Sequence, residues 1–392
     1  MRVVTDALED SSPEVVAAAV RRLVELEGER ATTALRARLF EVDLSLVPDV
    51  AKALARIGDR GVVGIAIAAL DDPRPGRRLA AVRVLDAVAD RESVESLRRG
   101  LDDDVAGVRA QALDALARIG GQAGTCASAD CARLLADPAP YVRIAAVRAV
   151  ASLEPQPGPL LAPAVQDRDR FVRLAVAQHA ASLPEQAARA LLEDGDVRVR
   201  EAAARAAGRR EVGALSVLLT DDPARDVRRA AARGLGGMHE ERVADLLIPG
   251  LEDRDALVRV AVLHALEQLL TRDQVVRRLC SELGDTRAVR RRACLYALAR
   301  LEAREVRREV SRAAIDPDPE VRLALIHIAE ALFDEPAPLM RYLSADRDEA
   351  VRDAAEVWLL RAAQASPLSH VYTDDPPEGH QPSTLPLPPP PV

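Results

Sequence analysis

The sequence contains few aromatic residues: Phe, Trp and Tyr together make up 2% of its 392 residues. Proteins that bind single-stranded nucleic acid stack the bases on aromatic side chains, so this chain offers little for such a platform. Lys52 is the single lysine, and the formal net charge is −8 at pH 7. Because a phosphate backbone is held by basic surfaces, we do not expect nucleic acid as a partner.

Long apolar segments are also missing. The sequence has no run of 18 apolar residues, which a membrane-spanning helix would need, and its first residues lack the apolar core of a signal peptide. We therefore expect no membrane partner and a cytoplasmic location.

Cysteine is rare, with four residues at Cys126, Cys131, Cys280 and Cys294. None of them forms a C-x2-C pair of the kind that binds zinc. Cys280 and Cys294 fall on the apolar stripes of predicted helices, which favours buried thiols. Cys126 and Cys131 are about one helical turn apart, which leaves a redox or metal role open. Overall, we expect no cofactor and no metal.

The chain does contain a repeated segment from one end to the other. An acidic residue is followed five positions later by a predicted core residue, here called the anchor, and then usually by arginine; Asp222, Val227 and Arg228 are typical. Successive anchors are 27 to 34 residues apart. The twelve anchors are Val15, Leu46, Arg77, Val108, Val142, Val172, Val199, Val227, Val258, Arg290, Val321 and Val351. Their acids are Asp10, Glu41, Asp72, Asp103, Asp137, Asp167, Asp194, Asp222, Asp253, Asp285, Asp316 and Asp346.

Each anchor begins a helical pattern. After Val258, the apolar residues Ala261, Val262, Ala265 and Leu266 follow at the spacing of one helix face. A shorter apolar segment precedes each anchor, so one repeat consists of two helices. Neither helix can bury its stripe alone, whereas stacked repeats bury a continuous core. The sequence therefore predicts an all-α solenoid.

The acid and the arginine of each repeat have predicted structural roles. Where proline follows the acid, as in Asp137-Pro138, the acid is expected to be the N-cap and the proline the first helical residue. The arginine after the anchor is expected to bind the acid of the neighbouring repeat and to fix the stacking register. The residues predicted to form this Asp–Arg ladder include Asp72, Arg78, Asp103, Arg109, Asp137, Arg143, Asp222, Arg228, Asp253 and Arg259.

The segment Asp-x4-Val-Arg followed by Ala-Ala-x-x-Ala-Leu resembles the HEAT repeat, in the short variety found in phycobilin lyases. The resemblance extends from Met1 to about Ala365. It implies a right-handed α-α superhelical solenoid of the HEAT and armadillo type. It also implies that the anchor-bearing helices line the concave face and that the preceding helices line the convex face.

The predicted domains are a solenoid over residues 1–365 and a tail over residues 366–392. The tail contains nine prolines and ends Pro386-Leu387-Pro388-Pro389-Pro390-Pro391-Val392, which is typical of a disordered segment with polyproline II character. Pro386 and Pro389 form a minimal P-x-x-P motif, so the tail is either passive or a docking peptide for a proline-reading domain. The repeats are least regular between residues 120 and 211, where Gly120–Gly124 is an insertion and a bend or join is expected.

Two families of enzymes use such repeats. Deoxyhypusine hydroxylases hold two irons with several His-Glu pairs, and here His239-Glu240 is the single such pair. We find no residue that would carry over a bilin-transfer role from the phycobilin lyases. His179, His264 and His327 lie singly in different repeats. We therefore expect a non-enzymatic scaffold or adaptor, with an enzyme or enzyme subunit of the lyase or hydroxylase type as the alternative.

The face of the anchor-bearing helices that points away from the core is the candidate binding surface. Six of the first eight residues at the sixth position after the anchor are basic, and an apolar row lies beside them at the second position. This arrangement is consistent with a groove for an acidic or amphipathic protein segment, and an ordinary solvated face is the alternative. The candidate partner-binding residues are Arg21, Lys52, Arg83, Arg148, Arg205, Arg233, His264, Tyr296 and His327.

Overall fold

The structure is a computed structural model that describes residues 2–10, 12–26, 29–89, 93–123 and 128–365. These residues form α-helices and short 3-10 helices, and none of them forms a strand. The all-α prediction is confirmed. The proline-rich tail, its P-x-x-P motif and Cys126 lie outside the described residues.

The chain divides into two compact units, Met1–Ala214 and Leu215–Val392. In each unit, anchor-bearing helices alternate with shorter outer helices. The anchor helices of the first unit are α2 (Pro13–Leu26), α4 (Val47–Arg56), α6 (Pro75–Val88), α8 (Ala106–Ala123), α10 (Pro140–Leu153), α12 (Arg170–Ala177) and α14 (Val197–Ala206). Those of the second unit are α16 (Arg225–Gly236), α18 (Ala256–Leu269), α20 (Ala288–Arg300), α22 (Pro319–Leu332) and α24 (Glu349–Ala365).

The outer segments are shorter, and many combine an α-helix with a 3-10 turn. In the first unit they are α1 (Arg2–Asp6), η1 (Ala7–Glu9), α3 (Glu29–Arg38), α5 (Gly61–Ala69), α7 (Ser93–Arg99), η2 (Gly100–Asp102), α9 (Ser128–Arg133), η3 (Leu134–Ala136), α11 (Gly158–Leu161), η4 (Ala162–Gln166), η5 (Ala180–Ser182), α13 (Glu185–Leu192) and η6 (Arg209–Glu211). Helix α15 (Val212–Asp221) spans the division between the units. In the second unit they are η7 (Glu241–Val243), α17 (Ala244–Leu247), η8 (Ile248–Glu252), α19 (Arg272–Glu282), η9 (Arg304–Val306), α21 (Arg307–Ser311), η10 (Arg312–Ile315) and α23 (Ala337–Leu343).

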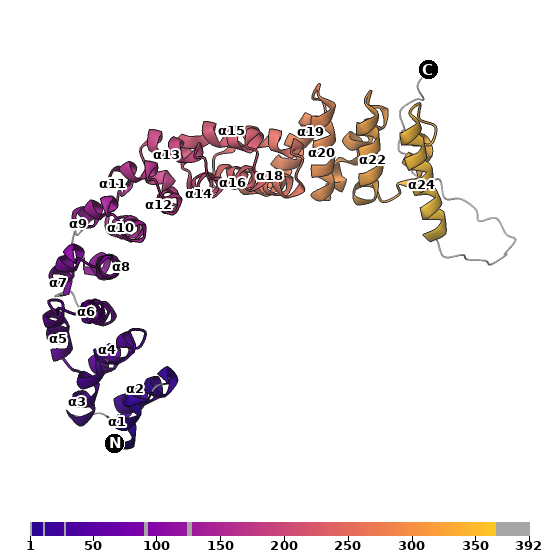
Figure 1. Ribbon diagram of the computed structural model, residues 1–392. Coiled ribbons are helices and arrows are strands. Elements are labelled where there is room, and N and C mark those ends of the chain that lie inside the picture. The colour runs from indigo at the N-terminus through magenta and orange to yellow at the C-terminus, as the bar shows by residue number, and fades with distance from the viewer. Residues whose placement is uncertain (1, 11, 27–28, 90–92, 124–127, 366–392) are drawn as a thin grey trace, which may run out of the picture. The chain divides into compact units, whose positions relative to one another are not determined.

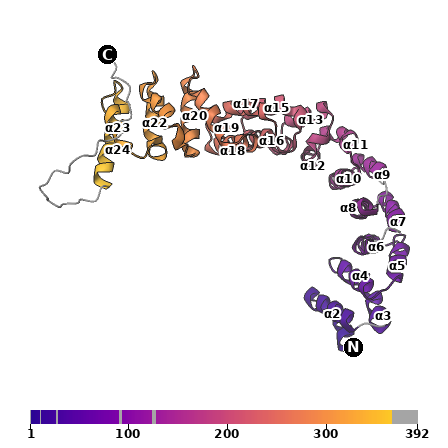
Figure 2. The ribbon, with the colours of Figure 1, turned by 180° about the vertical axis from the view of Figure 1, so that it is seen from behind.

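Successive anchor helices pack side by side, as Figures 1 and 2 show for α2 to α10 in the first unit. Their cores consist of small and branched apolar residues. In α10, for example, Val142, Ala145, Ala146 and Ala149 are at most 1% exposed and lie at the predicted helical spacing. Each repeat therefore buries its stripe against its neighbours, and the predicted solenoid is confirmed. The division between the units lies beyond residues 120–211, and α8 continues through Gly120 and Gly121.

The first anchor lies one residue later than the spacing from the acid predicts. Val15 is 39% exposed, whereas Val16 is 4% exposed and is followed by buried Ala19, Val20 and Leu23. In the second repeat, the predicted anchor Leu46 is buried, as is Val47 after it. The first repeat has two adjacent apolar residues, so spacing from the acid alone does not decide which of them is buried. Arg21 consequently lies five residues after its anchor and not six.

The acid of each repeat is not the helix N-cap, as the Asp-Pro dipeptides had suggested. Asp137, for example, is the C-cap of η3, and α10 begins three residues later at Pro140. Its Oδ1 accepts the backbone N–H of Ala139 at 2.8 Å, which closes the turn between the two helices. Side-chain N-capping is performed by an acid two residues further on in at least five of the described repeats, namely by Asp169, Asp196, Asp255, Asp318 and Asp348.

The arginine after the anchor connects three parts of the structure. The Nε and Nη2 atoms of Arg143 donate to the two oxygens of Asp167 in the next repeat at 2.7 and 2.8 Å. Its Nη1 donates to the backbone oxygen of Asp137 in its own repeat at 2.8 Å. The same two-pronged contact, with Nε to Oδ2 distances of 2.6–2.8 Å, occurs in Arg78–Asp103, Arg109–Asp137, Arg173–Asp194, Arg228–Asp253, Arg291–Asp316 and Arg322–Asp346.

Two of the predicted ladder residues have other partners. Asp72 receives its hydrogen bonds from Arg74 of its own turn, because the preceding repeat has Val47 where other repeats have the arginine. Arg259 donates to the backbone oxygens of Asp253 and Arg254 in its own repeat. Asp222 accepts the backbone N–H of Ala224 at 2.8 Å, the same turn contact that Asp137 makes in its repeat.

Removing one ladder arginine leaves a half-buried carboxylate without its partner, so we expect Arg143→Gln to reduce the free energy of unfolding by about 1–3 kcal/mol. Arg148 lies on the same helix but is exposed and forms a surface ion pair with Asp114. The matched variant Arg148→Gln should cost below about 1 kcal/mol. Urea unfolding followed by circular dichroism measures both. Equal effects of the two substitutions would contradict the structural role of the ladder.

The ladder also predicts a dependence of stability on pH. Desolvation raises the pKa of Asp137 and Asp167, but hydrogen bonds from Arg109 and Arg143, with those of the turn amides, outweigh it and hold each pKa below the usual value. A lowered pKa in the folded state adds stability above the unfolded pKa of about 3.9, and this stability is lost as the carboxylates are protonated.

We therefore expect the urea midpoint to be steady near neutral pH and to decrease progressively below about pH 4. Urea titrations in a series of buffers measure this change. The variant Asp167→Asn should show a shallower decrease than the wild type, because it has one titrating ladder carboxylate fewer. A midpoint that rises on acidification would refute the prediction.

Candidate functional site

The candidate partner-binding residues lie on the anchor helices and point away from the core. Arg148, Arg205 and Arg233 are exposed, as are His264, Tyr296 and His327. Arg21 and Lys52 are exposed as well. Arg83 is half-buried, and its Nη1 donates to the backbone oxygen of Leu44 at 2.6 Å. We call this surface the anchor face. Each unit has its own anchor face, which is formed by the anchor helices of that unit.

The basic residues of the anchor face do not form an uninterrupted positive row. Arg148 is paired with Asp114 of the preceding anchor helix at 2.8 Å, and Arg205 is paired with Glu201 on its own helix. Asp86 lies among them too: burial raises the pKa of its carboxyl group, and the charges of Arg118 and Lys52 oppose that shift. Asp114 belongs to the same sixth-position series as Arg148, whereas Asp86 and Glu201 lie at other positions of their helices, so acids both within and beside the basic row reduce its positive charge.

Three of the six basic residues keep a free charge. Within the described residues, Arg21, Lys52 and Arg233 make no ion pair or hydrogen bond through their side chains. Arg21 and Lys52 belong to the first unit and Arg233 to the second. These three, and not the paired arginines, are the cations that an acidic partner could engage without first breaking a contact.

An apolar series that the predicted binding surface did not include occupies the residue directly before the anchor. Tyr141, Phe171, Leu257 and Val289 occupy this position in α10, α12, α18 and α20, and each is between 47 and 52% exposed. The guanidinium of Arg170 lies 4.8 Å from the centre of the Phe171 ring. In a chain with so few aromatic residues, exposed rings at a repeated position are a signal that could have been read from the sequence.

A cavity of about 330 Å³ opens on the anchor face of the second unit, between η8, α18, α20 and α22. Tyr296 and His327 form part of its wall, and the Tyr296 hydroxyl lies 3.2 Å from His327 Nδ1. Desolvation raises the pKa of Tyr296, whereas the charges of Arg292 and Arg259 act to lower it. The cavity thus brings together two of the predicted site residues, while His264 lies outside its lining.

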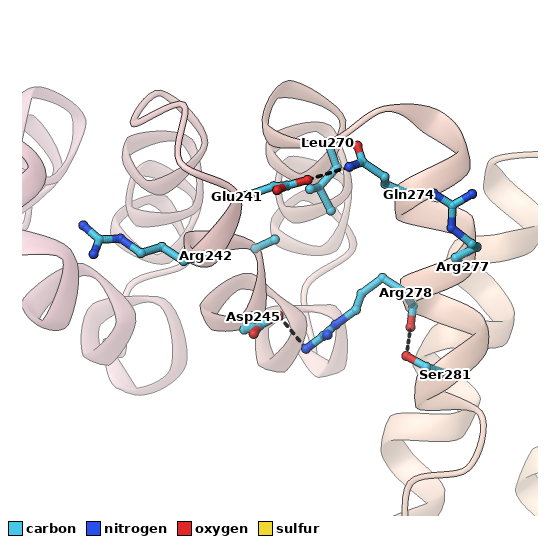
Figure 3. A pocket seen from close by; sticks show the side chains of 9 residues that line it. Glu241, Arg242, Asp245, Leu270, Gln274, Arg277, Arg278 and Ser281 are labelled. Carbon is cyan, nitrogen blue, oxygen red and sulfur yellow. Dashed lines mark hydrogen bonds and ion pairs between the residues drawn. The ribbon is translucent and has the colours of Figure 1, made fainter.

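A second cavity, of about 500 Å³, lies between the outer helices α17 and α19 (Figure 3). Two polar contacts cross the gap between these helices. Arg278 is paired with Asp245 at 2.5 Å, and Gln274 donates to Glu241 at 2.5 Å, as Figure 3 shows. These contacts join adjacent repeats on the outer side, so we interpret the cavity as part of the packing between repeats.

The residues considered for metal or redox chemistry are dispersed. Burial raises the pKa of the Cys131 and Cys294 thiols to about 12, and Cys280 is half-buried. His239 has a positive φ of 53° in the turn after α16, and Glu240 is bound by Arg242. Among the described residues, no group of three or more His, Cys, Asp or Glu side chains is arranged to hold a metal ion. None of the described helices has the length and apolar character that crossing a bilayer requires.

Comparisons with known proteins agree with the repeat architecture. The sequence matches the HEAT-repeat family over residues 49–123 and 212–285. No curated protein matches it. Among solved structures, Kap95p in its complex with RanGDP is similar with a TM-score of 0.50 and 12% sequence identity, over 94% of this chain and 61% of Kap95p. The YibA protein of E. coli aligns with a TM-score of 0.47 and 17% identity, over 67% of this chain and 98% of YibA.

These similarities concern the fold. At 12% identity, the likeness to Kap95p extends to the stacking of helix pairs and not to particular binding residues. The chain spans about three fifths of the length of Kap95p. The short variety of the repeat found in phycobilin lyases remains an expectation from the sequence motif.

Proposed function

We propose that this chain, which is a HEAT-repeat protein, is a non-enzymatic scaffold that binds another protein on its anchor face. The observation that carries the proposal is the series of exposed apolar side chains directly before the anchors, namely Tyr141, Phe171, Leu257 and Val289. Large apolar groups that lie exposed at a repeated position are characteristic of interaction surfaces.

The free cations of the anchor face indicate the character of the partner. A face that carries exposed apolar side chains and the cations Arg21, Lys52 and Arg233 suits a segment with both apolar and acidic residues. Kap95p, whose solenoid resembles this one, was solved with RanGDP bound, which illustrates that such a fold can hold another protein. We place the scaffold in the cytoplasm. A proline-reading domain that docks on residues 366–392 is a further proposed partner.

The proposal is tested with a triple variant on the anchor face, Tyr141→Ser, Phe171→Ser and Leu257→Ser. These side chains are exposed, so the variant should keep its helicity and lose the proteins that the wild type captures from a lysate of the native organism. Affinity capture followed by mass spectrometry, with circular dichroism on the same samples, measures both quantities.

The matched control replaces three exposed apolar residues of the outer segments, Val3→Ser, Val217→Ser and Ile315→Ser. This control should capture the same proteins as the wild type. If the outer variant loses them and the anchor-face variant keeps them, the binding surface is the outer side and the proposal is wrong.

A further inference from the structure

The contact between the repeats of α18 and α20 is built differently from its neighbours. Its anchor is Arg290 in place of an apolar residue, and the guanidinium is buried. Arg290 binds Glu252 of the preceding repeat through Nε and Glu282 of α19 through Nη1, the latter at 3.1 Å. The cross-repeat ion pair therefore runs from the anchor back to the preceding repeat, opposite in direction to the Asp–Arg ladder.

A similar reversal occurs at the other arginine anchor, but with one difference. Arg77 binds Glu41 of the preceding repeat, whose ladder position is Val47, so no arginine is left over there. In the repeat of α18, the ladder arginine Arg259 is still present. Asp285, its expected partner, accepts its side-chain and turn hydrogen bonds from Arg287 instead.

Arg259 therefore keeps an unused hydrogen-bonding edge. Its Nη1 donates to the backbone oxygens of Asp253 and Arg254 at 2.7 and 3.2 Å, as in the other repeats. Within the described residues, its Nε and Nη2 have no carboxylate partner, although in seven other repeats the same two atoms hold an aspartate. The guanidinium is thus pre-positioned in the geometry that accepts a carboxylate through two parallel hydrogen bonds.

Arg259 is one of the residues that line the 330 Å³ cavity described above. The acids of the cavity wall are already occupied. Glu252 is bound by Arg290, Asp253 by Arg228 and Glu320 by Arg292. Among the described residues that line the cavity, Arg259 is the one charged side chain without an oppositely charged partner. A ligand that brings a single negative charge would balance it.

The rest of the cavity wall specifies what the carboxylate should be attached to. Val289, Leu323 and Ala324 provide apolar surface, and the Tyr296–His327 pair provides polar groups. We propose that the cavity receives an acidic side chain of a partner protein, with the carboxylate on Arg259 and apolar neighbours against α20 and α22. The proposal adds a specific contact to the proposed scaffold function and rests on it for the nature of the partner.

The charges of the wall favour a carboxylate over a phosphate group. Glu252, Asp253 and Glu320 lie around Arg259, and a group with close to two negative charges would be repelled by them more strongly than a singly charged one. Each ladder contact in this protein is, moreover, made to a carboxylate. Inorganic phosphate is therefore expected to be a poor competitor.

The test compares two probe peptides that differ in one group, acetyl-Leu-Glu-Leu-amide and acetyl-Leu-Gln-Leu-amide. Both ends are blocked, so the glutamate peptide has a single carboxylate. Saturation-transfer NMR on the full chain measures their dissociation constants. We expect the glutamate peptide to bind at least about tenfold more tightly than the glutamine peptide, because a charged, two-pronged contact is worth at least about 1.4 kcal/mol.

Variants of Arg259 test whether this residue causes the preference for the glutamate peptide. Arg259→Gln should abolish it, and Arg259→Lys, which keeps the charge without the fork, should retain a smaller preference. Arg352 has the ladder position in the last repeat, bonds to the backbone oxygens of Asp346 and Arg347, and is not part of the cavity wall. Arg352→Gln is therefore the matched control and should keep the full preference. Circular dichroism checks that each variant is folded.

Three results would overturn the proposal: equal binding of the two peptides to the wild type, an unchanged preference in Arg259→Gln, or displacement of the glutamate peptide by phosphate more readily than by acetate. The lysine variant keeps the test decisive if the glutamine variant fails to fold. Neither Tyr141, Phe171 nor Leu257 lines the cavity. The two proposals can fail separately. If the wild type prefers the glutamate peptide but the triple anchor-face variant still captures the same partner proteins, the cavity proposal holds and the proposed scaffold surface is refuted.

Discussion

The two-pronged hydrogen bond between an arginine and the aspartate of the next repeat is the interaction on which the regularity of this protein depends. The arginine side chain is fixed at one end by the backbone oxygen of its own turn and at the other by the next carboxylate. Because the guanidinium is planar, this arrangement defines both the separation and the rotation of neighbouring repeats. The apolar core of alanine, valine and leucine supplies stabilisation but is less directional.

Substitution at the anchor changes the direction of this contact. Arg77 and Arg290 replace an apolar anchor, and each forms an ion pair with an acid of the preceding repeat. The repeats still stack, so an ion pair in either direction is compatible with the fold. The two cases differ in the ladder position of the preceding repeat. Before Arg77 this position is Val47, whereas before Arg290 it is Arg259, which is left without a carboxylate partner among the described residues. The arginine at anchor position 290 thereby leaves a charged position on the anchor face, at Arg259.

The sequence was sufficient to predict the elements that follow from periodicity. The two-helix repeat, the buried stripe of α18 and the pairing of arginines such as Arg109 and Arg143 with the next acid depend on spacing alone. The first anchor was misplaced by one residue because Val15 and Val16 are both apolar, and burial rather than spacing distinguishes them. Asp137 was assigned to the wrong helix end because a turn carboxylate and an N-cap have the same dipeptide, and the 3-10 turn before it is not visible in the pattern.

The candidate site was less predictable, because it depends on pairs of residues that lie far apart in the sequence. Arg148 is neutralised by Asp114, 34 positions earlier, and only the stacking of α8 and α10 brings them together. The free edge of Arg259 likewise results from what Arg290 and Arg287 do in the next repeat. A series taken at one position of the repeat describes a surface, whereas the charge of that surface depends on which residues of neighbouring repeats pair with one another.

The central claim is that the Asp–Arg contact is made throughout the second unit except between Arg259 and Asp285. Double-mutant cycles measure this directly, with Arg228→Gln and Asp253→Asn for a formed contact and Arg259→Gln and Asp285→Asn for the absent one. Urea unfolding of the single and double variants should give a coupling energy of about 0.5–3 kcal/mol for the first pair and a value near zero for the second. Equal coupling in the two pairs would contradict the account, because Arg259 would then be engaged with Asp285 and unavailable to a ligand.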